Sequence, residues 1–226
     1  MTKPVRVLVV DDDSLVRSGL KMMLGGAETL EVVGEVDDGR GVLAAVDRHR
    51  PDVVLMDIRM PHLDGIAATR LVRSQPEPPA VIVLTTFHAD ELVVRAIQAG
   101  AAGFLLKDTA PADLVRAIES VHAGEGALSP AVARRLIALV AGDSDATARQ
   151  DEAMARMATL TPREREVAVA VAEGLSNAEI GRRLHMSLAT VKAHVSRLLT
   201  KFAVENRVQV SLLVHEASMG FTQREQ

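Results

Sequence analysis

Two hydrophobic periodicities alternate along the first half of the chain. Short apolar runs rich in β-branched residues predict strands buried on both faces; these runs lie at Val5–Val10, Glu31–Val36, Pro51–Met56, Ala80–Leu84 and Gly103–Leu106. After each run comes a stretch of roughly 10–14 residues whose apolar positions recur every three or four residues, the period of a helix. Five strands alternating with five helices predict an α/β fold. We expect a doubly wound parallel sheet with the flavodoxin-like strand order 2-1-3-4-5.

The pattern changes after residue 123. Ser129 followed by Pro130 is typical of a helix start, so we expect a helix over about 130–141. Residues 142–150 are small and polar with no apolar period, which predicts a flexible linker. We therefore expect the segment 124–158 to connect two domains.

Helix-start signals define the remaining part, residues 159–218. The segments Thr161–Glu164 (TPRE) and Ser176–Glu179 (SNAE) each match a capping box, in which Ser or Thr is followed three residues later by Glu. Ser187 and Asn206 supply two further caps. This part is predicted to be an all-α domain with helices at roughly 162–173, 177–184, 188–202 and 206–217.

The composition narrows the class of protein. The 226 residues are 48% hydrophobic and 25% charged, which is typical of globular domains and argues against disorder. There is no apolar run long enough to span a membrane and no secretory signal, so we expect a cytoplasmic protein without a membrane partner. The absence of cysteine excludes disulfides, thiol catalysis and thiolate metal sites. With no Trp, no Tyr and four Phe, there is little material for stacking on single-stranded nucleic acid.

The distribution of charge changes what the net charge means. Taken over the whole chain, a net charge of −4 argues against a nucleic-acid partner. Residues 1–123, however, carry 13 Lys and Arg against 18 Asp and Glu, whereas residues 159–226 carry 9 against 7. An acidic N-terminal part and a mildly basic C-terminal part indicate two partners of opposite charge.

Polar side chains occur where the predicted strands end. Asp11 and Asp12 follow the first strand, Asp57 the third, Thr85 the fourth and Lys107 the fifth. The carboxyl ends of the strands form the ligand crevice of an open parallel sheet, and the expected order places these four strands side by side. Three carboxylates, a hydroxyl and an ammonium therefore converge on one edge.

This group of residues suits phosphoryl chemistry with Mg²⁺. Close carboxylates repel one another unless a cation neutralises them, and oxygen ligands without Cys or His favour Mg²⁺. Asp57 can attack phosphorus to give an aspartyl phosphate, with Mg²⁺ offsetting the charge on the transferring group. Lys107 and Thr85 would then contact phosphoryl oxygens.

Four segments resemble the signature segments of the receiver domain of two-component response regulators, and the similarity covers residues 5–123. The segments are VLVVDDDS, VVLMDIRMPHLDG, VIVLTTF and GFLLKD. The resemblance implies that Asp57 is the phosphoacceptor, that Asp12 binds the metal directly and that Asp11 acts mainly through water. It also implies that Arg59 offers its backbone carbonyl to the metal.

The same resemblance assigns three further residues. Thr85 and Phe104 would be the switch pair and Lys107 the phosphate partner. Asp13 is peripheral and is expected to cap the first helix. Where the family often has Pro after the lysine, this chain has Asp108, which leaves the geometry of that peptide bond open.

One helix of the C-terminal part presents two distinct faces. On a wheel of residues 188–202, Leu188, Val191, Val195, Leu198, Leu199 and Phe202 form an apolar arc. The other arc holds small residues and two cations but no acid; it consists of Ala189, Lys192, Ala193, Ser196, Arg197 and Thr200. Such a face suits the DNA major groove. Together with the short helix and the turn before it, this helix is predicted to form a helix-turn-helix unit.

The segment LTPREREV…GLSNAEIGRRLHMSLATVKAHVSRLLTKF resembles the LuxR-type DNA-binding domain over about 160–217. Lys192 matches the base- or phosphate-contacting lysine of that family. Ala193 and Ser196 depart from a common pattern of a larger apolar residue and a lysine, so Arg197 and Lys201 are candidates to supply charge. The last helix resembles the family's dimerisation helix.

Together the two resemblances imply a response regulator of the NarL/FixJ type. A histidine kinase would phosphorylate Asp57, and the chain would then regulate transcription, as a homodimer bound to paired half-sites in double-stranded promoter DNA. We expect it to be no enzyme beyond its own phosphotransfer and dephosphorylation.

Two alternatives stay open at this point. The receiver could work without phosphorylation, by dimerising or binding a ligand. The motif Asp11-x-Asp13 after a strand is also similar to that of haloacid-dehalogenase-type phosphatases, although the substrate cap and distal acidic pair of those enzymes are not found in the chain.

Overall fold

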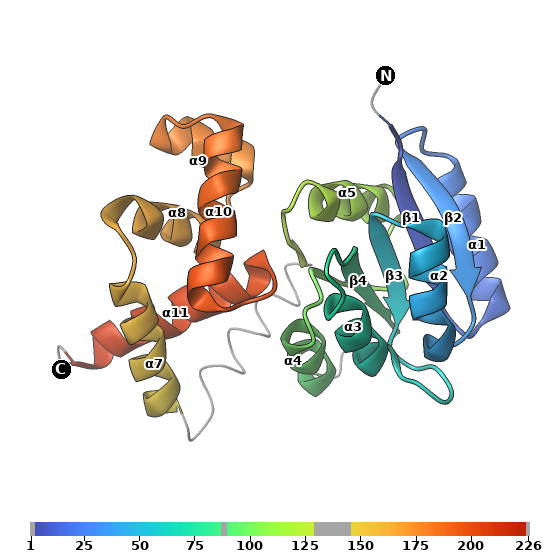
Figure 1. The fold of residues 1–226 in the computed structure, drawn as a ribbon, viewed down its shortest axis with the longest axis horizontal. Coiled ribbons are helices and arrows are strands. Elements are labelled where there is room, and N and C mark those ends of the chain that lie inside the picture. Colours follow the sequence, from blue (N-terminus) through green and yellow to red (C-terminus); the bar gives the residue numbers. More distant parts are fainter. Residues whose placement is uncertain (1–2, 87–89, 129–145, 225–226) are drawn as a thin grey trace. The chain divides into compact units, whose positions relative to one another are not determined.

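The computed structural model describes residues 3–86, 90–128 and 146–224 (Figure 1). The chain divides into two compact units, residues 1–129 and 130–226. Among the described residues, no helix combines the length and apolar character needed to cross a membrane.

The first unit is built on a parallel sheet with strand order β2-β1-β3-β4-β5-β6. Its strands are β1 (Val5–Val10), β2 (Leu30–Val36), β3 (Val53–Asp57), β4 (Ala80–Thr85), β5 (Gly103–Leu106) and β6 (Ala127–Leu128). The predicted order of the first five strands is confirmed. The two-residue β6 was not predicted; it adds a sixth strand beside β5 in a segment assigned to the connection.

Helices cover both faces of the sheet, as expected. They are α1 (Ser14–Gly25), α2 (Val42–His49), α3 (Gly65–Arg73), α4 (Asp90–Gln98) and α5 (Pro111–His122), with a short 3₁₀ turn at Gly39–Gly41. One core joins α1 and α5 to alternate residues of the strands, including Val7, Leu55 and Leu84. Helices α2, α3 and α4 lie on the opposite face (Figure 1).

The pairing of β1 with β2 contains a bulge. Val7 pairs with Val32, but the next residue, Leu8, pairs with Gly34, so Val33 is an extra residue in β2. A bulge shifts the alternation of side chains by one position and thereby sends the residues after it to the other face of the sheet.

Local signals place the helices next to the strand ends. The Asp13 side chain accepts hydrogen bonds from the backbone of Leu15 and Val16 and so caps α1. Asp64 caps α3 in the same way. The following Gly65 lies against the backbone of Asp57, and a Cβ at this position would overlap with the carbonyl oxygen of Asp57. Glycine at this position therefore allows α3 to start directly beside the end of β3.

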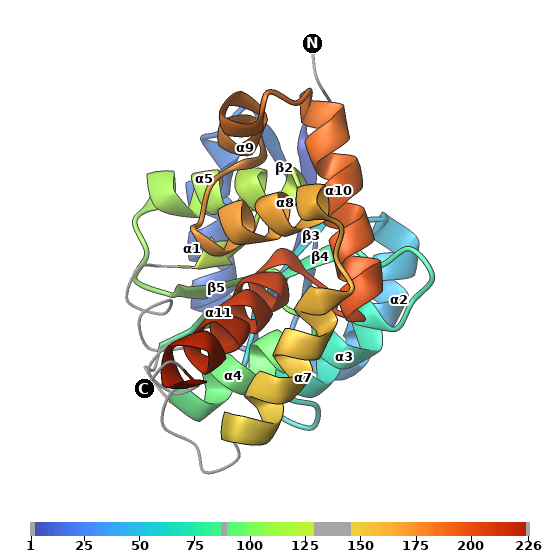
Figure 2. The same ribbon diagram turned by 90° about the vertical axis from the view of Figure 1, so that its left-hand side faces the viewer.

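The second unit is helical (Figure 2). Its described helices are α7 (Ala146–Ala158), α8 (Pro162–Ala172), α9 (Asn177–Leu184), α10 (Leu188–Phe202) and α11 (Arg207–Arg224). Both predicted capping boxes are present, at Thr161 and Ser176, and Ser187 caps α10. The core gathers buried residues of α8, α9, α10 and α11, among them Val171, Ile180, Leu198 and Val210.

The prediction of a flexible linker over residues 142–150 is wrong from residue 146 onward, and the end of the connecting segment 124–158 is helical. Residues 146–158 form α7, which lies along α11 (Figure 2). Ala153 is only 3% exposed, and Arg156 donates a hydrogen bond to the backbone carbonyl of Phe202 at 2.6 Å. The sequence signal is weak because α7 is mostly polar, and its short apolar stripe of Ala153, Met154 and Met157 is buried in the core of the second unit. The predicted helix over about 130–141 lies outside the described residues.

Two smaller predictions about the helical domain also need correction. Leu188, assigned to the core face, is 51% exposed at the first turn of α10. The final helix extends to Arg224, beyond the predicted end at residue 217.

Candidate functional site

The three predicted carboxylates meet at one edge of the sheet. Asp11 and Asp12 directly follow β1, and Asp57 is the last residue of β3, the neighbour of β1. One oxygen atom from each of the three carboxylates can be chosen such that all lie within 4.8 Å of one another. Asp11 and Asp57 are buried, whereas Asp12 is exposed. The cluster is therefore accessible from the side of Asp12.

Lys107 projects into the same cluster. It follows β5, and its backbone N–H donates to the carbonyl of Thr85 at the end of β4. The ammonium lies 2.6 Å from Oδ2 of Asp11 and 3.0 Å from Oδ1 of Asp57. Lys107 thus bridges Asp11 and Asp57, the residue predicted to accept the phosphoryl group.

The pKa values reflect this mixture of burial and charge. Burial raises the pKa of Asp57, and the hydrogen bond and attraction from Lys107 offset this only in part. Burial alone lowers the pKa of Lys107, but its contacts with Asp11 and Asp57 outweigh that effect and raise it overall. Lys107 accordingly stays a cation beside the two carboxylates.

The donor set fits a hard divalent cation. The carboxylates of Asp11, Asp12 and Asp57 carry three negative charges against the one positive charge of Lys107, and carboxylate oxygen is the ligand type preferred by Mg²⁺. The structure thus provides an acidic pocket able to bind a metal. Asp13 belongs to the α1 cap instead, which removes the second acid of the phosphatase-like motif. Arg59 lies two residues after Asp57 with its side chain exposed, and its carbonyl stays a predicted ligand.

The predicted switch pair lies on one face of the sheet. Leu84 and Leu105 belong to the core under α1 and α5, so their chain neighbours Thr85 and Phe104 face the side of α3 and α4. Both side chains are buried, at 2% and 1% exposed. All described peptide bonds are trans, including that between Lys107 and Asp108.

The predicted DNA-binding face of α10 is exposed. Every residue assigned to this face is exposed, namely Ala189, Lys192, Ala193, Ser196, Arg197 and Thr200. Buried Val191, Val195 and Leu198 hold the other side of the helix in the core. Within the part of the chain that the structure describes, neither Lys192 nor Arg197 forms an ion pair. Their charges are therefore available to a nucleic acid.

The turn before α10 has the geometry of a helix-turn-helix unit. Helix α9 ends with His185 in the left-handed region, and Ser187 caps α10 two residues later. Gly181 permits this tight turn, because a Cβ there would lie 2.8 Å from the carbonyl oxygen of Met186.

Lys201 occupies a different environment from the other predicted DNA contacts. Its ammonium donates a hydrogen bond to Oε2 of Glu164 at 2.7 Å, in the N-terminal turn of α8. This contact joins α10 to α8 and engages the charge that the sequence analysis assigned to DNA.

Sequence reasoning missed one residue at the acidic cluster. Arg17 in α1 donates a hydrogen bond from Nη1 to the backbone carbonyl of Asp11 at 2.6 Å. No sequence pattern indicated it, because its approach to the cluster depends on the tertiary pairing of α1 with β2.

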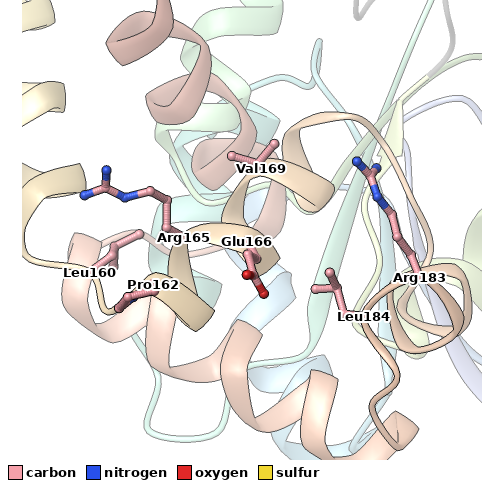
Figure 3. A pocket seen from close by; sticks show the side chains of 7 residues that line it. All are labelled: Leu160, Pro162, Arg165, Glu166, Val169, Arg183 and Leu184. Carbon is pink, nitrogen blue, oxygen red and sulfur yellow. The ribbon is translucent and has the colours of Figure 1, made fainter.

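A groove of about 580 Å³ lies between α8 and α9 of the second unit. Apolar residues that line it include Leu160, Val169 and Leu184, and Arg165 and Arg183 lie on opposite sides of it (Figure 3). None of the residues that line it belongs to the predicted phosphorylation or DNA-binding sets.

Comparison with known proteins assigns a family to each of the two units. Residues 7–119 match the family described as "Response regulator receiver domain", and residues 158–214 match "Bacterial regulatory proteins, luxR family". The chain is 34% identical over 214 residues to the nitrate/nitrite response regulator protein NarL of Escherichia coli strain K12, covering 95% of this chain and 96% of NarL.

Solved structures give the same result. The response regulator ChrA of a heme-sensing two-component system matches with a TM-score of 0.53 and 31% identity, over 96% of this chain and all of ChrA. A structure of two RcsB dimers bound to two parallel DNAs matches with a TM-score of 0.55 and 25% identity, over 96% of this chain and 99% of RcsB. A receiver domain implies a histidine kinase as partner, and a LuxR-type domain implies DNA. The chain therefore belongs to the two-component response regulators that join a receiver domain to a LuxR-type helix-turn-helix domain.

Proposed function

We propose that this protein is a transcription regulator whose DNA binding is controlled by phosphorylation of Asp57 by a histidine kinase. The observation that supports the proposal best is the position of Asp57, which lies among two further carboxylates and 3.0 Å from the Lys107 ammonium. This is the arrangement that an aspartate needs to accept a phosphoryl group beside a divalent cation.

Asp57 is the nucleophile in this reaction. One carboxylate oxygen forms a bond to phosphorus while the bond from phosphorus to the donor's imidazole nitrogen breaks, and the imidazole leaves with that electron pair. Mg²⁺, when bound by Asp11, Asp12, Asp57 and the Arg59 carbonyl, offsets negative charge on the phosphoryl group. Lys107 is placed to move its ion pair from the carboxylates to a phosphoryl oxygen, and Thr85 to donate a hydrogen bond to another.

The switch then acts on the side of the sheet where α3 and α4 lie. Thr85 and Phe104 share that face, so a movement of Thr85 toward the phosphoryl group leaves space that Phe104 can fill. The altered surface favours a homodimer, a shift between two existing states. The RcsB dimers on DNA support this assembly by analogy.

Dimerisation is the natural point of control for DNA binding. Residues 159–226 carry a net charge of only +2, so a single helix-turn-helix domain binds DNA weakly and in a salt-sensitive manner. Two linked domains on paired half-sites bind far more tightly than one. We further propose that the chain works in the cytoplasm and catalyses only its own phosphotransfer and dephosphorylation.

The assignment of Asp57 is tested with acetyl phosphate and Mg²⁺. The wild type should take up one phosphoryl group and Asp57→Asn none, measured by mass spectrometry of the intact protein. Asp113→Asn, which changes an exposed carboxylate on α5, is the matched control and should be phosphorylated normally. Stoichiometric aspartyl phosphate in Asp57→Asn would contradict the proposal.

A second experiment separates control by phosphorylation from a receiver that works without it. Protected DNA is mapped with and without beryllofluoride, a phosphoryl mimic. Stronger or extended protection with beryllofluoride is expected. Identical protection in both conditions would favour the unphosphorylated alternative.

A further inference from the structure

We infer that Arg17 is a positioning residue that sets the geometry of the acidic cluster and thereby its affinity for Mg²⁺. The inference rests on the proposed function, because it concerns the metal that assists phosphorylation of Asp57. Arg17 touches no reacting atom; it acts through the backbone of Asp11.

The contact is short and specific. Nη1 of Arg17 donates to the carbonyl oxygen of Asp11 at 2.6 Å, and the Arg17 side chain is only 17% exposed. That carbonyl belongs to the peptide group that joins Asp11 to Asp12. A hydrogen bond from a charged donor is stronger than one from a neutral donor. Arg17 therefore restrains the orientation of the peptide group between Asp11 and Asp12, two of the three residues that supply carboxylates.

The bulge in β2 supplies the partner that holds Arg17 in place. After the bulge, Gly34 pairs with Leu8, and a Cβ on Gly34 would meet the side chains of Leu8 and His49 on the α2 face. The next residue, Glu35, therefore points to the α1 face. There its carboxylate lies 3.9 Å from Nε of Arg17 and 2.7 Å from Nζ of Lys21.

The cluster benefits from such a restraint because its acids repel one another. Other contacts of the loop after β1 include hydrogen bonds from Asp11 N to the Val36 carbonyl at 3.1 Å and from Asp13 N to Asp11 Oδ1 at 3.0 Å, and the Lys107 ion pair with the Asp11 side chain. Arg17 adds a restraint on the Asp11 carbonyl and a positive charge on the side of the loop facing α1. Residues that orient metal ligands in this way typically change metal affinity 10- to 100-fold when removed.

The test measures Mg²⁺ binding to the full-length protein without a phosphodonor. Backbone amide shifts are followed by NMR during titration with MgCl₂. Arg17→Met should raise the dissociation constant for Mg²⁺ roughly 10- to 100-fold, and Arg17→Lys should restore part of the affinity. Lys21→Met is the matched control: it removes the other cation on Glu35 but leaves the Asp11 contact intact, so its affinity should equal that of the wild type.

Kinetics separate positioning from a loss of structure. With acetyl phosphate, the Mg²⁺ concentration for half-maximal phosphorylation should rise in Arg17→Met by the same factor as the dissociation constant. The rate at saturating Mg²⁺ should change less. If Arg17→Met fails to fold, Glu35→Gln carries the test, because Glu35 is 32% exposed and its neutralisation loosens both Arg17 and Lys21, of which Lys21→Met controls for the second; a smaller loss of Mg²⁺ affinity is expected there.

The outcomes distinguish this inference from the proposed function. Wild-type Mg²⁺ affinity in Arg17→Met, or in Glu35→Gln when Arg17→Met does not fold, overturns the role of Arg17 and leaves the assignment of Asp57 standing. An equal loss of affinity in Lys21→Met also overturns it, because the effect would then follow charge rather than the Asp11 contact. Phosphorylation of Asp57→Asn overturns the proposed function instead.

Discussion

The ammonium of Lys201 lies 2.7 Å from Oε2 of Glu164, so a cation of α10 is bound to the capping box of α8. The same Glu164 oxygen accepts hydrogen bonds from the backbone N–H and the hydroxyl of Thr161, both at 2.9 Å. One carboxylate thus closes the N-terminus of α8 and fixes α10 against it. Among the basic residues of α10, Lys201 is thus paired with Glu164, whereas Lys192 and Arg197 form no ion pair in the described part of the chain.

The pKa of Glu164 should report the Lys201 contact directly. The hydrogen bond from Lys201, followed by those from Thr161, lowers the pKa of Glu164 from 4.5 to about 2. Because the folded pKa is lower than the unfolded one, the stability that this carboxylate contributes is fully present above about pH 4.5 and is lost as the pH falls toward 2. Side-chain ¹³C shifts should give a pKa near 2 in the wild type and a value closer to 4.5 in Lys201→Met. An unchanged pKa in that variant would show that the contact is not formed in solution.

DNA binding should distinguish Lys192 from Lys201. Lys192 is exposed and unpaired within the described part of the chain, so Lys192→Ala should weaken binding to a generic duplex and reduce the slope of log K against log salt by about 1. Lys201→Met should leave the slope nearly unchanged. Fluorescence anisotropy with labelled DNA over a range of salt concentrations measures both. A larger change of slope in Lys201→Met than in Lys192→Ala would show that Lys201 contacts DNA.

Gly65 should tolerate no side chain. A Cβ at this position would overlap with the backbone carbonyl of Asp57, which cannot move without disturbing the phosphoacceptor. Gly65→Ala should therefore lower the free energy of unfolding by about 3 kcal/mol, at the upper end of the cost of overpacking, and slow phosphorylation. Gly19→Ala is the control, since no atom lies within 4 Å of its added Cβ and alanine favours helix by about 1 kcal/mol. Equal effects of the two substitutions on urea unfolding would contradict this account.

Helix α7 should unfold together with the helix-turn-helix domain. Ala153→Asp places a charge in the contact with α11 and should cost roughly 1–3 kcal/mol. Ala155→Asp lies on the exposed side of α7 and should cost only the difference in helix propensity, about 0.7 kcal/mol. Amide hydrogen exchange in α7 and α11 measures both. Loss of protection in α7 without any change in α11 would show that α7 is a separate linker helix.

The first five strands and the capped helix starts of this protein follow from local sequence, and the order of those strands follows from the connection rules of doubly wound sheets. A continuous apolar run such as Val5–Val10 is typical of a strand in a sheet that is covered on both faces. Residues such as Asp13, Thr161 and Ser187 satisfy free N–H groups within their own helices, so their roles need no distant partner. The converging acids are predictable because each lies at the carboxyl end of a strand and β1 and β3 are neighbours in the sheet.

Other features were decided only by the tertiary structure. Helix α7 is mostly polar and is buried by contact with α11, and Lys201 is paired with Glu164 of another helix. Arg17 reaches Asp11 because one extra residue in β2 turns Glu35 toward α1. By itself, the sequence determined the first five strands, the helices that alternate with them and the polar residues at the strand ends, since these depend on neighbouring positions along the chain. The tertiary structure alone decided which charges are paired and which stay exposed, because an ion pair between distant residues depends on packing that no local pattern encodes.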